Sequence, residues 1–107
     1  MEAALKAISE PRRRAILQLV RDEERTAGEI ADHFEVTRPA VSQHLRVLRE
    51  AGLVAERRDG TRRWYRARPE TIRDLQRFLE DFWDEGLERL KAAAEWDERR
   101  KRRGAKA

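Results

Sequence analysis

Residues 36–53 constrain the fold more than any other stretch of this chain, because they specify one amphipathic helix with both ends marked. Three apolar residues spaced at i, i+4 and i+7 form a stripe along one face, namely Val41, Leu45 and Leu48. Thr37 is a good N-cap, since its hydroxyl can accept a hydrogen bond from a free N–H in the first turn. Gly52 stands where a Schellman ending needs a left-handed residue. A helix that begins after Thr37 and ends before Gly52 is therefore predicted.

The opposite face of this helix is polar and basic, and it contains no acid before Glu50. The residues on this face are Arg38, Ser42, Gln43, His44 and Arg46. Surface helices usually mix both signs of charge, so such a face is suited to an anionic partner that can also accept and donate hydrogen bonds. The alternative at this point is a solvated polar face without a partner.

The charge of the chain is segregated along its length. Residues 36–68 contain nine arginines and three acids, whereas residues 69–98 contain four bases and ten acids. Residues 99–107 contain six bases and no acid. Arginine is the side chain best suited to forked contacts with phosphate or guanine. The basic helix, the segment after it and the tail are thus the parts of the chain suited to an anionic partner.

The composition excludes several classes of protein. A chain of 107 residues is long enough for one domain, expected over residues 1–98, followed by a basic tail at 99–107 that is expected to fray or to touch an anionic partner such as a nucleic acid non-specifically. The absence of cysteine excludes disulfides and thiolate metal sites. No apolar run approaches the ~18 residues of a membrane span, and the first residues lack the features of a signal peptide. A cytoplasmic protein without membrane contact is expected.

Three helices are predicted before the basic helix. A short one covers residues 2–8, and Ser9-Glu10-Pro11 restarts the helix with a capping residue, an acid and a proline. The second helix then runs to about Glu23. Thr26-Ala-Gly-Glu29 matches a capping box and opens a third helix over 27–34.

Three successive arginines, Arg12 to Arg14, lie near the start of the second helix, where they oppose the helix dipole. Their position suggests another use, such as a phosphate contact. Surface solubility is the alternative.

Residues 26–52 thus consist of two short helices joined by a tight turn, and the second carries the polar, basic face. This arrangement is that of a helix-turn-helix, which places its second helix in the DNA major groove. Helix pairs of this kind also occur as packing units, so the pattern alone leaves both interpretations open.

A β-hairpin is predicted over residues 53–67, because the periodicity changes to two and Asp59-Gly60 suits a type I′ turn. A two-residue turn there puts Val54 opposite Tyr65 and Arg57 opposite Arg62. Val54 and Tyr65 are expected to face the core, with Trp64 partly exposed. Directly opposed arginines are destabilising, and an anionic partner would relieve that cost. An Arg-rich hairpin after such a helix is a wing.

Residues 69–98 are predicted to form a long helix with a broad apolar stripe and one glycine. At about 1.5 Å per residue it would reach roughly 45 Å, which is more than a domain of this size can cover. An overhanging apolar helix favours pairing with a second copy, and it would then set the distance between two copies. The alternative is that it folds back on its own core. Trp96 lies beyond the stripe and has no assigned role.

The order of these elements resembles that of the ArsR-type winged helix-turn-helix repressors of bacteria and archaea. The resemblance is carried by SEPRRRAILQLV (9–20) and by EIADHFEVTRPAVSQHLRVLREAGLVAERRDGTRRWYRA (29–67), and especially by Ser42–Leu45 and the Asp59-Gly60 wing. It implies a mainly α fold with a small β-hairpin. It also implies a homodimer that binds a palindromic operator in double-stranded DNA and usually represses transcription.

The resemblance implies contacts of four kinds. Base edges would be contacted by Ser42, Gln43 and Arg46. Backbone phosphates would be contacted by Thr37, Arg38 and His44. The wing would reach the flanking DNA through Arg58, Arg62 and Arg63. The dimer interface would include, from the first and last helices, Leu5, Ile8, Leu79, Phe82, Trp83, Leu87 and Leu90.

The sequence departs from the many members of the family that sense metals. Its third helix has no cysteine, its last helix has no histidine, and both histidines lie in the helix-turn-helix. No metal and no cofactor are therefore expected, and the effector is unknown. A hard-metal site of acids within residues 81–88 is a weaker interpretation than a solvated acidic face.

Two classes of function remain after an enzyme is set aside. The chain has no cysteine nucleophile and no glycine-rich phosphate loop, and Ser42 and His44 are only two residues apart on a helix, so their side chains diverge. A sequence-specific repressor is the first hypothesis. The alternative is a general nucleic-acid or protein-interaction module that uses the wing, the tail and Trp64.

Overall fold

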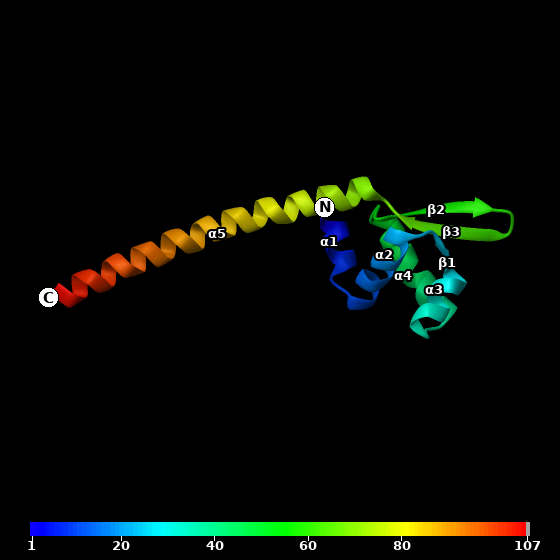
Figure 1. Ribbon diagram of the computed structural model, residues 1–107, viewed down its shortest axis with the longest axis horizontal. Helices are drawn as coiled ribbons and strands as arrows, with labels where there is room; N and C mark the ends of the chain where they lie inside the picture. Colours follow the sequence, from blue (N-terminus) through cyan, green and yellow to red (C-terminus); the bar gives the residue numbers. More distant parts are fainter. Residues whose placement is uncertain (107) are drawn as a thin grey trace. The chain divides into compact units, whose positions relative to one another are not determined.

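A computed structural model describes the backbone of residues 1–106 and the side chains of residues 1–101. The elements follow in the order α1 (Glu2–Ile8), α2 (Pro11–Asp22), β1 (Arg25–Thr26), α3 (Ala27–Phe34), α4 (Arg38–Glu50), β2 (Val54–Asp59), β3 (Arg62–Ala67) and α5 (Pro69–Lys106) (Figure 1). The chain divides into two compact units, the first over residues 1–75 and the second beginning at Gln76. The first unit contains the helix-turn-helix and a small antiparallel sheet, and so has the predicted winged helix-turn-helix fold.

The boundary between α1 and α2 lies where it was predicted, but the capping residue is not Ser9. Glu10 is the N-cap of α2, and its carboxylate accepts a hydrogen bond from the backbone N–H of Arg13 at 2.9 Å. Ser9 instead ends α1, where its hydroxyl donates to the carbonyl of Lys6 at 2.6 Å. Ser9 therefore caps the end of α1, and Glu10 caps the start of α2.

Helices α3 and α4 both begin at the predicted threonine caps. The hydroxyl of Thr26 accepts from the N–H of Glu29 at 3.2 Å, and that of Thr37 accepts from the N–H of Ala40 at 3.3 Å. Between the helices, Glu35 takes a left-handed conformation with φ 53°, which ends α3 abruptly and turns the chain into α4.

The end of α4 is a Schellman motif, as predicted. Gly52 has φ 76°, and its N–H donates to the carbonyl of Arg49 at 3.0 Å. The N–H of Leu53 donates to the carbonyl of Leu48 at 3.0 Å, and both leucine side chains are fully buried. The chain therefore leaves α4 in one fixed direction, towards the sheet.

The sheet has three strands in the order β1–β3–β2, all antiparallel, where only the hairpin was predicted. Strand β1 pairs Arg25 with Tyr65 and Thr26 with Trp64. Two residues are too few to show an alternating pattern, so this strand carries no signal in the sequence. It fastens the end of α2 and the start of α3 to the hairpin.

The predicted register of the hairpin is wrong by two residues. The loop is Gly60-Thr61 rather than Asp59-Gly60, because Asp59 pairs with Arg62 and Val54 pairs with Ala67. Gly60, the first loop residue, has φ 64° and Thr61 does not have a positive φ, as in a type II′ turn. The glycine does supply the turn, but from the first loop position.

The predicted buried face of the hairpin is confirmed. Val54 and Tyr65 are buried and Trp64 is half-buried. A shift of two residues keeps every side chain on its own face, which is why the face is right although the register is not. The opposed arginines are Arg58 and Arg63, not Arg57 and Arg62.

The core of the first unit draws apolar side chains from all of its helices and from the hairpin. Its largest fully buried side chains are Ile16, Val20, Ile30, Val41, Leu45, Leu48, Leu53 and Val54. Three of them, Val41, Leu45 and Leu48, form the inner stripe of α4, so the core holds this helix with its polar face outward.

Helix α5 begins at Pro69 as predicted and continues to Lys106, past the expected end at residue 98. The basic tail is thus helical rather than frayed as far as it is described, and residue 107 lies outside the described residues. Across the described part of the chain, no helix is both long and apolar enough to cross a membrane.

The apolar residues predicted for a dimer interface fall into two groups. In the second unit, Leu79, Phe82, Trp83, Leu87 and Leu90 are between 42% and 65% exposed. In the first unit, Leu5 and Ile8 are half-buried against the core of their own chain. The stripe of α5 is therefore unpartnered within the second unit, whereas the α1 residues already have contacts.

Candidate nucleic-acid interface

The outward face of α4 is polar and basic over its first turns. Four residues of this face are exposed, namely Arg38, Ser42, Gln43 and Arg46. The first turn contains no acid, and Thr37 caps it from the side chain. A helix held by its apolar stripe therefore presents hydrogen-bonding and cationic groups to the outside.

A hollow of about 530 Å³ lies beside this face, between the start of α3, the start of α4 and the hairpin. Arg38 and Ser42 line it from α4, and Arg62 and Arg63 line it from β3. A smaller hollow of about 200 Å³ lies further along α4, and its lining also includes Ser42 and Arg63 together with Arg46. Arginines of the helix and of the wing thus line the same two hollows, the larger of which also has Glu29 and Asp32 at its α3 side.

The three arginines predicted to act from the wing are all exposed. Arg58 and Arg63 are directly opposite each other in the β2–β3 ladder, and Arg62 is opposite Asp59 next to the loop. In Figure 1 the loop of the β2–β3 hairpin projects away from the helices of the first unit. Like charges opposed across a ladder destabilise it, so an anion bound at Arg58 and Arg63 would relieve a local cost.

Acidic side chains tether several of these arginines. Arg46 Nε lies 3.1 Å from Glu50 Oε1, one turn along α4. Glu56 on β2 contacts two arginines, Arg49 from the end of α4 and Arg63 from β3, the latter at 3.6 Å. Neither Glu56 nor Arg49 was among the residues predicted for the site. The alternation of β2 was the available signal, because it places Glu56 on the same face as the buried Val54.

His44 differs from the other residues predicted to contact DNA. Its side chain is only 25% exposed, and Nδ1 lies 3.8 Å from Glu10 Oε2 at the start of α2. His44 therefore lies at the edge of the α4 face, against α2, whereas Arg38 and Ser42 are on its exposed part.

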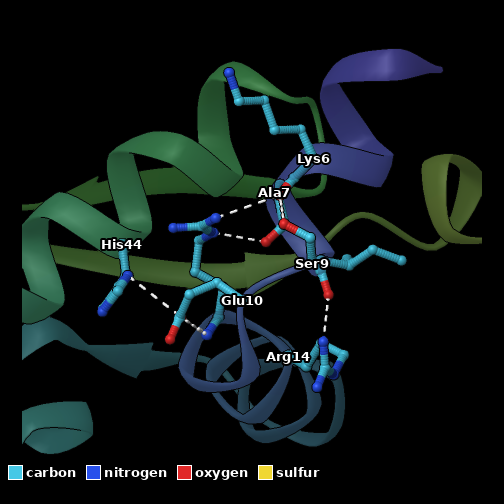
Figure 2. A network of polar contacts seen from close by, with 8 residues as sticks. Lys6, Ala7, Ser9, Glu10, Arg14 and His44 are labelled. Carbon is cyan, nitrogen blue, oxygen red and sulfur yellow. Dashed lines mark hydrogen bonds and ion pairs between the residues drawn. The ribbon is translucent and has the colours of Figure 1, made fainter.

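Glu10 is the centre of a polar network between α1, α2 and α4 (Figure 2). Burial of its carboxyl acts to raise the pKa, but hydrogen bonds from the backbone N–H groups of Arg13 and Arg12 and the charges of His44 and Arg13 outweigh it. The pKa of Glu10 is therefore lowered from its ordinary value, and the residue stays ionised as the cap of α2.

Arg13 and Arg14 contact the end of α1, which is a use that neither of the two predicted alternatives, a phosphate contact or surface solubility, included. Arg13 Nε donates to the carbonyl of Ala7 at 2.6 Å, and Arg14 Nη1 donates to the carbonyl of Ile8 at 2.7 Å (Figure 2). The last carbonyls of a helix have no partner within it, so these contacts hold a seven-residue helix that is too short to be stable alone.

Arg57 fastens the wing to the segment after α2. Its Nε and Nη2 donate to the two carboxylate oxygens of Glu24 at 3.0 and 3.1 Å, and its guanidinium lies 5.9 Å from the centre of the Trp64 ring. The hydrogen bonds from Arg57 lower the pKa of Glu24, and those to Glu24 raise the pKa of Arg57. This arginine is therefore engaged within the fold.

We expect Glu24→Gln to reduce the loss of stability in acid. Because the folded-state pKa of Glu24 is lowered, the stability that it contributes is present above its ordinary value of 4.5 and is lost as the pH falls through the folded-state pKa. The variant should unfold at a lower temperature than the wild type at about pH 7, and the difference should shrink towards about pH 3. Thermal unfolding across this range tests it, with the exposed Glu95→Gln as control. A difference that is the same at both ends would contradict it.

Among the residues whose side chains are described, no three of histidine, cysteine, aspartate or glutamate lie together in a way that could hold a metal ion. The acids predicted as a weak alternative, within residues 81–88, therefore form no such group in the second unit.

Comparisons with known proteins agree with this architecture. The sequence model for the bacterial regulatory protein, arsR family, matches residues 10–56. The transcriptional repressor SdpR of Bacillus subtilis (strain 168) is 35% identical over 86 residues, which are 80% of this chain and 96% of that protein. A possible transcriptional regulator for arsenical resistance, known from its crystal structure, is 45% identical in sequence. The match covers 83% of this chain and 93% of that chain, with a TM-score of 0.72.

A third similar protein is Mb0332 from Mycobacterium bovis, a possible ArsR-family transcriptional regulator. The solution structure of its homodimeric winged helix-turn-helix DNA-binding domain matches with a TM-score of 0.65. The two sequences are 33% identical, and the match covers 78% of each chain. The likeness to SdpR extends over most of both chains, and the two solved structures share the fold described above. The chain belongs to the ArsR family of bacterial regulatory proteins, which are DNA-binding transcriptional regulators and not enzymes.

Proposed function

We propose that this chain is a sequence-specific transcriptional repressor that binds a palindromic operator as a homodimer. Helix α4 enters the major groove, and the wing contacts the flanking DNA. The observation that carries the proposal is the exposed, acid-free first part of α4 beside the arginines of the wing. The named function of the relative SdpR, a transcriptional repressor, supports the sign of regulation.

The roles of the individual residues follow from their chemistry. Ser42, Gln43 and Arg46 contact base edges, since hydroxyl, amide and guanidinium groups match the donors and acceptors of the major groove. Thr37, Arg38 and His44 contact backbone phosphates at the start of the helix, and Arg58, Arg62 and Arg63 do so from the wing. The exposure of all except His44 supports this assignment.

The homodimer is supported by the apolar stripe of α5. Leu79, Phe82, Trp83, Leu87 and Leu90 are exposed within the second unit, and single-chain proteins rarely expose a contiguous apolar face of this kind. A second copy would bury it. The homodimeric state of the Mb0332 domain also supports this assembly. Leu5 and Ile8 would complete the interface from α1.

The proposal is tested by finding the DNA that the protein selects. Fragments bound in the host are sequenced, and a palindromic duplex from them is compared with a scrambled duplex by fluorescence anisotropy over a range of salt concentrations. Sequence preference that persists as salt weakens the binding supports an operator-binding regulator. A steep salt dependence with no preference would instead support the general nucleic-acid module. A promoter fused to a reporter then gives the sign of regulation.

We expect Arg46→Ala to cost about 1–3 kcal/mol of binding to the selected duplex and to relax specificity at one base position. The reason is that a guanidinium at a base edge contributes both affinity and discrimination. Binding is measured on the selected duplex and on single-base variants of it. Arg21→Ala is the matched control, because Arg21 is an exposed arginine on α2 that is paired with Asp22. An equal loss on every sequence would count against the assignment to a base edge.

A further inference from the structure

Gly28 is the second residue of α3, and its backbone does not need a glycine. The glycines with positive φ in the described residues are Gly52 and Gly60, so an alanine could take the conformation of Gly28 without strain. Glycine is also a poorer helix former than alanine. A reason for glycine here must therefore lie in what surrounds it.

The space that a side chain would occupy at Gly28 is filled by the guanidinium of Arg38. A Cβ built there would lie 2.9 Å from Nη2, 3.2 Å from Cζ and 3.4 Å from Nε of Arg38. The first of these distances is one that real Cβ atoms essentially never show, so a Cβ at Gly28 would make the guanidinium, the far end of a flexible side chain, move aside. The head of Arg38, from the first turn of α4, therefore rests directly on the backbone of α3.

In this position the exposed Arg38 packs its guanidinium against α3 without using its hydrogen-bond donors. Among the described side chains, Arg38 forms no ion pair and donates no side-chain hydrogen bond, although Glu29 and Asp32 border the same hollow. The hollow is also lined by Arg62 and Arg63 of the wing. The donors of Arg38 thus stay available at a hollow that two wing arginines also line.

We propose that Gly28 is a positioning residue, which holds the Arg38 guanidinium where it can bind a DNA phosphate. This inference rests on the proposed function and adds a residue outside α4 and the wing to it. A free arginine loses rotamer freedom when it binds. The bare backbone of Gly28 lets Arg38 lie against α3 before DNA arrives, so less of that freedom remains to be lost.

Gly28→Ala tests the inference, because stability and binding should move in opposite directions. The variant should unfold at the same temperature as the wild type or higher, since alanine favours the helix. Its affinity for DNA should fall about threefold to tenfold, because the added methyl group displaces the guanidinium while the charge is kept. Binding is measured with a fluorescein-labelled duplex of mixed sequence and about 30 base pairs at low salt, since a phosphate contact does not depend on sequence.

A double-mutant cycle with Arg38→Ala separates the possible outcomes. Arg38→Ala should weaken binding and reduce the slope of log affinity against log salt by about 0.9, and adding Gly28→Ala to it should change nothing further. Full affinity in Gly28→Ala, or the same loss in both backgrounds, would overturn the role of Gly28. No binding of the duplex by the wild-type protein would instead overturn the proposed function.

Discussion

Leu45→Ala is expected to lower the free energy of unfolding by about 2–5 kcal/mol, because it leaves a cavity in the core under α4. Leu45 is 1% exposed and lies in the middle of the stripe that holds this helix. For a unit of this size the loss should lower the midpoint of thermal unfolding on the order of 10–30 °C. Circular dichroism during heating measures the shift, and DNA binding should disappear with the fold.

Two control substitutions lie on the same helix. Gln43→Ala removes an exposed side chain and should change the free energy of unfolding by less than about 0.5 kcal/mol, although it weakens binding if Gln43 contacts a base. Leu45→Met keeps the volume and should cost less than about 1.5 kcal/mol. Similar unfolding temperatures for the alanine variants at 45 and 43 would show that α4 is not held by this stripe.

Phe82→Glu is expected to convert a dimer into a monomer, because it places a charge in the apolar stripe that the second copy would bury. Phe82 is 65% exposed within the second unit, so the variant should not disturb the fold of one chain. Sedimentation equilibrium should report the single-chain mass of 12.7 kDa instead of twice that value. Affinity for a palindromic duplex should fall by about 10²-fold or more, since the second half-site is no longer bound by a linked copy.

Arg77→Glu is the control for this variant, as it introduces the same side chain at another exposed position of α5. It should leave the dimer intact. The proposed assembly would be wrong if the wild-type protein itself sedimented as a folded monomer over the micromolar range.

The parts of the fold that the sequence predicted are those fixed by short-range chemistry. Thr26 and Thr37 cap their helices because a hydroxyl at that position meets a free N–H in the next turn, whatever the rest of the chain does. Gly52 adopts φ 76° for a similarly local reason, since a residue without Cβ tolerates the left-handed region. The polar face of α4 follows directly from the position of its apolar stripe.

The parts that were missed depend on contacts between distant residues. Asp59-Gly60 and Gly60-Thr61 both offer a glycine for a two-residue turn, and local preference does not decide between them. In the structure, Val54 pairs with Ala67, and the N–H of Arg68 donates to the carbonyl of Leu53 at 2.8 Å. These contacts close the base of the hairpin and fit the observed register.

The same limit applies to the site. The contacts of Arg13 and Arg14 with the carbonyls of α1 require a sharp turn between two helices, which no spacing in the sequence reveals. The contact of Arg38 with Gly28 joins residues ten positions apart on two different helices. The sequence therefore identified a basic surface, but not which of its arginines are already engaged within the fold.

The strand order has a consequence for the solubility of the protein. Since β3 is central, β2 is an edge strand, and one side of its backbone has no neighbour within the sheet. Unpaired edges can recruit strands from other molecules and start aggregation, and charged side chains are a common protection against this. Arg57, Arg58 and Asp59 supply such charges along β2. Neutralising the wing arginines would thus remove a barrier to aggregation as well as a contact with DNA, and glutamine or alanine variants of the wing need a check for self-association before their binding is compared.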